Sequence, residues 1–499
     1  MRSKRIPGWA QVLGTAAAAL AFLLVYELAV YRVPLQQIFL PCSYWSDEVI
    51  YSKQLAAVVR CGAPQGYFGF NESHAASGTF AAWGPAVFFR LRAAGLFLRG
   101  QNAFFSGAIC CLWLQGGPFF ARAARLNGKQ QAVFAAALAA FNAPIRYVFS
   151  AMQEPLHYAL VLAVLGCGIL ARRDKSRAAW GALCLLCAVA TLVRPYEAVL
   201  WLYPLALAWH DRHRIAVCVA GGAVSLGGTL VLMSKFYAPY FFTNVDMTPV
   251  QELLHGHPIE ALKDVVHKLI GALQTVGQTI LTDFSQRSGG YYLLFFLLLC
   301  IVLACLAWDV RRQRPVFWKG CAAATSGIVF LALMLMYRPG EGSRHTLILD
   351  LLLLASLLLE NRRPAAATAA VSVLLALTGV LSLAKGYGLP RYSEVWDNEV
   401  QQVQAALEKS QAAVDSEDPW DHTAAYAFLD EVHCGLLYGV PDGMGIQFDE
   451  NSYLENAANP VYARYVFTSA GSNTAARLTA DGWSVLYESE KCVLYERTR

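Results

Sequence analysis

The sequence has little charge. Of its 499 residues only 15% are Asp, Glu, Lys or Arg, whereas 56% are hydrophobic, and the mean hydropathy is +0.39. A soluble chain of this length needs more charged side chains to cover its surface. The apolar residues instead gather in blocks long enough to cross a hydrocarbon core of about 30 Å. We therefore expect a polytopic α-helical membrane protein.

The motifs of several enzyme and binding classes are missing. No GxxxxGK[ST] or GxGxxG string stands between a predicted strand and helix, which argues against a P-loop or dinucleotide-binding domain. No basic stretch alternates with aromatic residues, so the net charge of +5 does not indicate nucleic-acid binding. No internal repeat appears, and no Cys/His spacing is typical of a zinc site.

Hydropathy predicts about eleven spanning helices, of which the sixth and tenth are short. The predicted spans are 12–31, 102–120, 132–150, 156–171, 178–193, 198–209, 215–234, 291–308, 317–337, 346–359 and 365–384.

Basic residues give these spans one orientation. Clusters of Lys and Arg precede the first span and separate the second span from the third and the fourth from the fifth. Further clusters separate the sixth span from the seventh, the eighth from the ninth and the tenth from the eleventh. Because cytoplasmic loops carry the excess of Lys and Arg, these clusters place the N-terminus in the cytoplasm and the C-terminus outside, across a plasma membrane that we expect to be bacterial. The first span is too long for a signal peptide and lacks a small-x-small cleavage site, so we interpret it as a retained anchor.

The outer face carries most of the chain outside the membrane. Long outer loops are predicted at about 32–100 and 235–290. We divide the chain into a transmembrane domain at 1–385 and an extracytoplasmic α/β domain at 386–499, in which a helix is expected at 393–414, a strand at 465–468 and a hairpin around 489–491. This domain either selects the acceptor or is a stabilising cap.

Four of the 13 cysteines lie outside the membrane, two in the first loop and two in the tail. They are Cys42, Cys61, Cys434 and Cys492. Two pairs in two external modules suit disulfides in an oxidising compartment, and four free thiols are the alternative.

The first outer loop places two carboxylates, Asp47 and Glu48, among aromatic residues just after the first span. Asp47 is either an N-cap or a functional acid, and Glu48 either supports it or faces water. The segment after Pro85 is apolar but contains Arg90 and further arginines. Since arginines inside a bilayer are costly, we expect a helix in the outer interface, with its arginines at the level of lipid phosphates. His74, Trp83 and Arg90 join Glu48 as candidate substrate contacts.

Polar residues near the outer ends of the later spans are scarce. Glu154 stands between the third and fourth spans, Arg194 follows the fifth, and Arg338, Arg344 and His345 lie between the ninth and tenth. The alternatives are a favourable acid at a helix start for Glu154 and interfacial anchors for the cations.

Together these acids and cations lie on one membrane face. Arginines bind phosphate oxygens in fixed bidentate geometry, and a carboxylate can take the proton of a hydroxyl nucleophile. A site with both, at the outer interface, suits a phosphate carried by a membrane lipid and a hydroxyl acceptor.

The order and sidedness of these residues resemble the GT-C superfamily of integral-membrane glycosyltransferases, which includes protein O-mannosyltransferases and aminoarabinose transferases. The resemblance rests on Ser46-Asp47-Glu48, Trp83-Gly84-Pro85, Gln153-Glu154-Pro155 and Arg194-Pro195. Two departures are that Trp83-Gly84-Pro85-Ala86 replaces the usual Lys/His-Pro-Pro-Leu and that the second acid is Glu rather than Asp.

The resemblance implies an inverting transfer of a sugar from a polyprenyl-phosphate donor to a glycan, lipid or protein hydroxyl outside the membrane. It implies Asp47 as the base and Glu154 as a second acid, which orients substrate or holds a divalent metal (Mg²⁺ or Mn²⁺) together with Asp47. The implied contacts to the donor phosphate are Arg194, Arg338, Arg344 and His345.

Two other functions remain open at this stage. A transporter or lipid flippase should show inverted repeats and charges at mid-bilayer, which the sequence does not. A non-catalytic protein of cell-envelope polymer assembly would keep the topology and lose the acids, so Asp47 and Glu154 count against it.

Overall fold

The computed structural model describes a part of the chain that covers most of the predicted spans and the C-terminal end. The described residues are 8–35, 67–68, 75–76, 116–140, 147, 154–236, 246, 248–286, 291–337, 345–359, 367–374, 394–410, 426–428, 436, 439–440, 446–448, 454, 456, 458, 461 and 464–498.

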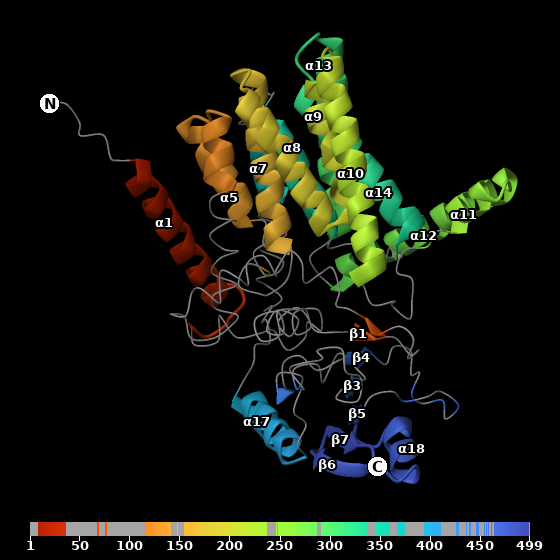
Figure 1. Ribbon diagram of the computed structural model, residues 1–499. Coiled ribbons are helices and arrows are strands. Elements are labelled where there is room, and N and C mark those ends of the chain that lie inside the picture. Colours follow the sequence, from red (N-terminus) through yellow and green to blue (C-terminus); the bar gives the residue numbers. More distant parts are fainter. Residues whose placement is uncertain are drawn as a thin grey trace.

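Long helices dominate this part of the chain and form a bundle (Figure 1). Within the described residues, four segments are long and apolar enough to cross a membrane, namely 156–173, 212–231, 292–311 and 317–336, so the predicted count of about eleven spans is not confirmed. Shorter apolar helices add to them. The apolar helices of this part of the chain are α1 (Gly8–Ala29), α5 (Gly128–Ala140), α7 (Glu154–Arg173), α8 (Arg177–Val193), α9 (Leu202–Leu207), α10 (Arg212–Phe236), α13 (Tyr291–Arg311), α14 (Phe317–Met336) and α15 (Thr346–Leu359).

Helix α15 is the centre of the bundle, although it is one of the two short predicted spans. Every residue from Thr346 to Leu358 is buried, and the helix contacts α7, α13 and α14. Its sequence is apolar on all sides, which is the pattern of a helix enclosed by other helices. The first residue before it, His345, is thereby held inside the bundle at one end.

A short 3₁₀ helix, η4 (Pro195–Trp201), interrupts the path from α8 to α9. Its last residue, Trp201, packs against α10 at a glycine: a Cβ atom on Gly221 would lie 2.4 Å from Cη2 of the Trp201 ring. An indole ring is rigid, so this close approach requires glycine at position 221. The contact fixes the end of η4 against α10.

We expect Gly221→Ala to lower the stability of the bundle by about 1–3 kcal/mol, because the added methyl group overpacks a contact that cannot yield. Gly228→Ala on the same helix is the matched control, since nothing lies within 4 Å of the Cβ position there. Thermal unfolding in detergent measures both. Equal melting temperatures for the two variants would contradict the assignment of this contact.

The predicted second outer loop contains α11 (Thr248–Leu254) and the long amphipathic α12 (Pro258–Gln286). Both extend to one side of the bundle (Figure 1). Asp246 attaches them: its N–H donates to the carbonyl of Met336 at 2.9 Å, and its carboxylate lies 2.8 Å from Nζ of Lys268.

The Lys268 ammonium, and after it the Thr248 hydroxyl and N–H, lower the pKa of Asp246 to about 2. A lowered pKa stabilises the folded state above the ordinary value for aspartate, about 3.9, and this contribution disappears as the pH falls through about 2. We therefore expect Asp246→Asn to speed hydrogen exchange in 248–286 by the same factor, relative to the unmodified chain, at pH 5 and pH 8. If the two chains exchange at the same rate at pH 5, the contribution is lost well above pH 2, and a group other than Asp246 is responsible for it.

The C-terminal part forms a mixed sheet of order β2-β1-β4-β3-β5-β7-β6. The predicted strand and hairpin are confirmed as β5 (Tyr465–Ser469), β6 (Ser484–Glu488) and β7 (Cys492–Glu496), with β6 and β7 antiparallel around the predicted turn. The other elements are α17 (Glu394–Lys409), β3 (Tyr426–Phe428), β4 (Ile446–Phe448) and α18 (Asn473–Ala480).

Two strands of this sheet come from the segment that the sequence predicts as the first outer loop. They are β1 (Tyr67–Phe68), which pairs in parallel with β4, and β2 (Ala75–Ala76), which pairs with β1. The sheet therefore crosses the domain boundary predicted at residue 385. It lies beyond one end of the helices, away from the N-terminal end of α1 (Figure 1).

Candidate active site

Helix α7 begins at Glu154 with Pro155 as its second residue. Proline has no N–H to leave unpaired in the first turn, and an acid is favoured there by the helix dipole, so the sequence itself sets this start. The Glu154 side chain is buried. A buried carboxylate needs a compensating partner, and α8 supplies it.

Arg194 ends α8. It adopts an extended conformation (φ −143°, ψ 121°) because a residue before proline is driven out of the helical region, and Pro195 follows. This extended residue directs the Arg194 side chain into the bundle, where it is only 12% exposed. The Arg-Pro pair thus ends one helix, starts η4 and aims a guanidinium inward.

The Arg194 guanidinium joins three elements. Its Nη2 donates to Oε1 of Glu154 at 3.1 Å, and its Nη1 lies 3.1 Å from the Tyr196 hydroxyl and 2.6 Å from Nδ1 of His345. A guanidinium only donates, so Nδ1 of His345 is the acceptor and the imidazole carries its proton on Nε2. The aromatic ring of Tyr337 meets the His345 ring edge-on at 5.2 Å.

A second pair of ionisable groups lies one helical turn further along. His157 follows Glu154 by three residues on α7, and Glu197 follows Arg194 by three in η4. Nδ1 of His157 is in direct contact with Oε1 of Glu197, and their side chains are 0% and 2% exposed. Two contacts, Glu154 with Arg194 and His157 with Glu197, therefore join α7 to the start of η4.

Three predicted site residues, Glu154, Arg194 and His345, are thus brought together from α7, α8 and the start of α15. The other predicted site residues lie outside the described residues and stay predictions: Asp47, Glu48, His74, Trp83, Arg90, Arg338 and Arg344. The cysteine pairs stay predictions for the same reason, since Cys42, Cys61 and Cys434 are not described.

Sequence reasoning missed Tyr196, His157 and Glu197. The spacing of three residues from Glu154 to His157, which puts both on one face of a helix, was a signal for His157, whereas no local pattern marks Tyr196 or Glu197.

The predicted divalent metal is not carried by the described residues alone. Across the described ranges no group of three or more His, Cys, Asp and Glu side chains is placed to hold a metal ion. Glu154 meets Arg194 through one oxygen, and Asp47, its proposed co-ligand, is not described. The metal remains a prediction.

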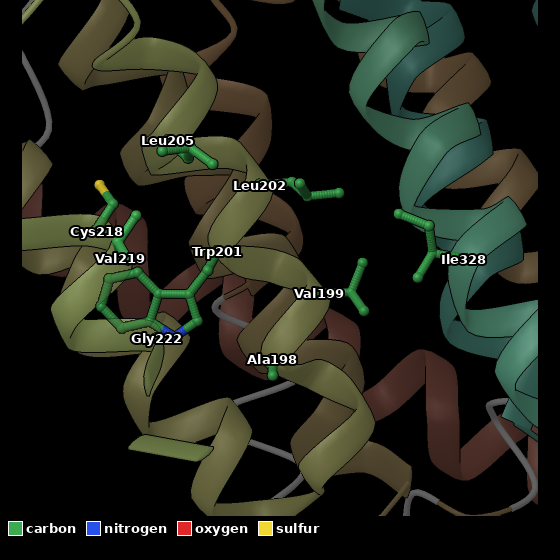
Figure 2. Close-up of a pocket in the computed structure, with 9 residues that line it drawn as sticks. All are labelled: Ala198, Val199, Trp201, Leu202, Leu205, Cys218, Val219, Gly222 and Ile328. Atoms are coloured by element: carbon green, nitrogen blue, oxygen red, sulfur yellow. The ribbon is translucent and has the colours of Figure 1, made fainter. Parts of the chain in front are cut away.

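An apolar groove runs beside η4, between this helix, α10 and α14 (Figure 2). Its volume is about 260 Å³, and Ile328 of α14 closes it opposite Val199. The groove begins a few residues after Arg194, so an apolar chain lying in it has one end near the polar cluster. Its lining residues are Ala198, Val199, Trp201, Leu202, Leu205, Cys218, Val219, Gly222 and Ile328.

Comparison with known proteins gives a fold. No protein-family model and no curated protein sequence matches this chain. A solved oligosaccharyltransferase of Archaeoglobus fulgidus, in a complex with Zn and sulfate, is similar with a TM-score of 0.55 at 9% identity, over 92% of this chain and 67% of that one. The chain has the GT-C fold. The fold that the sequence resemblance implies is thereby confirmed.

Further solved states of the Archaeoglobus fulgidus enzyme share this GT-C fold. The archaeal oligosaccharyltransferase AglB in complex with an inhibitory peptide and a dolichol-phosphate has a TM-score of 0.53 at 11% identity, over 92% of this chain and 69% of that one. A form tethered to an acceptor peptide with the NVT sequon has a TM-score of 0.51 at 11% identity, over 98% and 74%.

Proposed function

We propose that this chain is a membrane glycosyltransferase that moves a sugar from a polyprenyl-phosphate donor to a hydroxyl acceptor on the outer face of the membrane. The acceptor is a glycan, a lipid or a protein. The GT-C fold supports the class, since similar folds are those of oligosaccharyltransferases, one of them solved with a dolichol-phosphate. The donor class, the acceptor and the base are our proposals.

The observation that carries the proposal is the meeting of Glu154, Arg194 and His345. These polar side chains come from the start of α7, the end of α8 and the residue before α15, and they meet at one end of a bundle with a mainly apolar core. Arginine offers a fixed fork of donors that matches phosphate oxygens, and Glu154 holds that fork in one orientation. A site of this kind suits a phosphate that enters from the membrane.

The reaction then follows from the groups available. The acceptor oxygen attacks the anomeric carbon from the face opposite the phosphate, Asp47 takes the hydroxyl proton, and the bond from the anomeric carbon to the phosphate oxygen breaks with its electron pair on the phosphate. Arg194 and His345 stabilise the charge that grows on the leaving phosphate, and we place Arg338 and Arg344 beside them. The configuration at the anomeric carbon inverts.

The groove beside η4 fits the hydrocarbon part of such a donor. Its lining is apolar and starts in the sequence at Ala198, shortly after the Arg194 cluster, by which we mean Arg194 with its partners Glu154, Tyr196 and His345. A polyprenyl tail lying there keeps its isoprene units out of water while its phosphate reaches the guanidinium.

The experiment is to incubate the purified chain with a panel of polyprenyl-phosphate sugars and to measure free polyprenyl phosphate. Release from at least one donor, increased by an acceptor, supports the proposal. Folded protein that releases nothing from any donor, and binds none of them, contradicts it and favours a transport or assembly role.

A further inference from the structure

Helix α12 exposes an apolar stripe along most of its length. Six large apolar side chains of this helix are between 47% and 70% exposed. At 3.6 residues per turn, their positions fall within a sector of about 100° around the helix axis. They are Ile259, Leu262, Val266, Ile270, Leu273 and Leu281. A continuous apolar surface of this kind marks a place where a protein meets a partner or a membrane.

The other two sides of α12 differ from this stripe. One side packs on the helices: Ala261, Ala272 and Val276 are buried, and the latter two belong to the main apolar core. A third side is polar and exposes Glu260 and Gln278. An exposed apolar side next to a polar side is the pattern of helices that lie in a membrane interface.

The attachment of α12 brings this stripe to the level of a membrane surface. Lys268 of α12 lies 2.8 Å from the Asp246 carboxylate, and the Asp246 N–H donates to the carbonyl of Met336 at 2.9 Å. Met336 is the last residue of 317–336, one of the segments long and apolar enough to cross a membrane. The end of such a segment lies where the hydrocarbon core meets the headgroups, and the predicted orientation makes this the outer surface. From there α12 extends to one side of the bundle (Figure 1).

Helices α13 and α14, which α12 contacts, also expose apolar side chains. Leu297 of α13 is 37% exposed and Leu331 of α14 is 47% exposed, both near the end of the bundle to which α12 is attached. Each of these helices contains an apolar segment that can cross a membrane, so these side chains face acyl chains. The stripe therefore adds to an apolar surface that the bilayer covers, which favours lipid over a second copy of the chain as its occupant.

We propose that α12 lies in the headgroup region of a phospholipid bilayer, with its apolar stripe among the acyl chains and its polar side in water. Removal of six large apolar side chains from water supplies the driving force. The inference goes beyond the proposed function and does not rest on it, because any activity carried by these spanning helices has the same bilayer beside α12.

Two glycines of α12 provide a matched test. Gly277 falls in the sector of the stripe and Gly271 on the polar side; both are exposed, and nothing lies within 4 Å of the Cβ position at either. A large side chain therefore fits at both positions. The photoreactive residue p-benzoylphenylalanine replaces one glycine at a time in the full chain, in phosphatidylcholine nanodiscs. After irradiation, mass spectrometry of the digested chain measures the fraction of the labelled peptide that carries one lipid.

We expect the lipid adduct at position 277 to be at least about tenfold more abundant than at position 271, since the stripe alone meets acyl chains. The same photoreactive residue in place of Val224, which is 73% exposed in the apolar segment 212–231, is the positive control and should give the adduct. No lipid adduct at position 277, or equal adducts at 277 and 271, overturns the proposal. A cross-link from position 277 to a second copy of the chain also overturns it and assigns the stripe to a dimer.

A second measurement needs no photoreactive group. Gly277→Glu and Gly271→Glu add the same charge at two open positions of one helix, and hydrogen exchange of 258–282 is compared in the same nanodiscs. A carboxylate is costly among acyl chains but not in water, so exchange should be at least about threefold faster in Gly277→Glu than in Gly271→Glu. Equal exchange rates in the two variants would show that the stripe faces water.

Discussion

Asp47→Asn should lower the release of polyprenyl phosphate by at least about 100-fold while donor binding stays within about threefold. Positioned general bases contribute roughly 10²–10⁴-fold, and an amide cannot take the proton of an acceptor hydroxyl. The change keeps the shape of the side chain, so a loss confined to the rate indicates an interaction made in the transition state. The assay follows donor consumption at saturating donor and acceptor.

The control for this prediction is Asp481→Asn, the same change at an exposed position after α18. It should release polyprenyl phosphate at the rate of the unmodified chain. Equal turnover by the Asp47 variant would remove Asp47 as the base and leave the remainder of the proposed site standing, since the Arg194 cluster does not depend on it.

Arg194→Ala should abolish turnover nearly completely, by about 10²–10³-fold, and also weaken binding of polyprenyl phosphate. The substitution removes the N–H groups that bind the phosphate in our proposal, and it leaves the Glu154 carboxylate buried without its guanidinium partner. Breaking a buried pair in this way costs about 3–5 kcal/mol, so the variant should also melt earlier. Arg194→Lys keeps the charge but not the fork, and we expect a loss of about tenfold in turnover.

A double variant separates the two effects of Arg194→Ala. Adding Glu154→Gln removes the unpaired carboxylate, so stability should recover while turnover stays low. Recovery of turnover together with stability would mean that Arg194 only holds the fold. Arg311→Lys, at an exposed position at the end of α13, is the control and should match the unmodified chain in both measurements.

The sequence predicted the convergence of Glu154, Arg194 and His345 because the orientation of the spans places all three at one membrane face. The pattern of apolar residues then indicates which of them lie in the interior. Because α15 is apolar on all sides, it belongs at the centre of a bundle, and His345, the residue before it, enters the interior with it. Those parts of the site rest on local patterns, which a single sequence displays.

The rest depended on structure that no local pattern displays. Glu197 faces His157 because the chain after Arg194 winds as a 3₁₀ helix, and a short 3₁₀ segment has no strong sequence signal. The strands at Tyr67–Phe68 and Ala75–Ala76 are too short for alternation to reveal, and the partner of the first lies at Ile446, far along the chain. Non-local pairing of this kind is visible only in three dimensions.

The pairing of β1 with β4 also sets how the protein can be divided. The loop that contains Asp47 places its strand inside the sheet built by the tail, so the tail is a folding partner of that loop rather than an appendage. A chain cut after residue 385 loses the neighbour of β1, and a tail taken from a related protein must match this loop as well as its own core. The smallest exchangeable unit is therefore the tail together with the first outer loop.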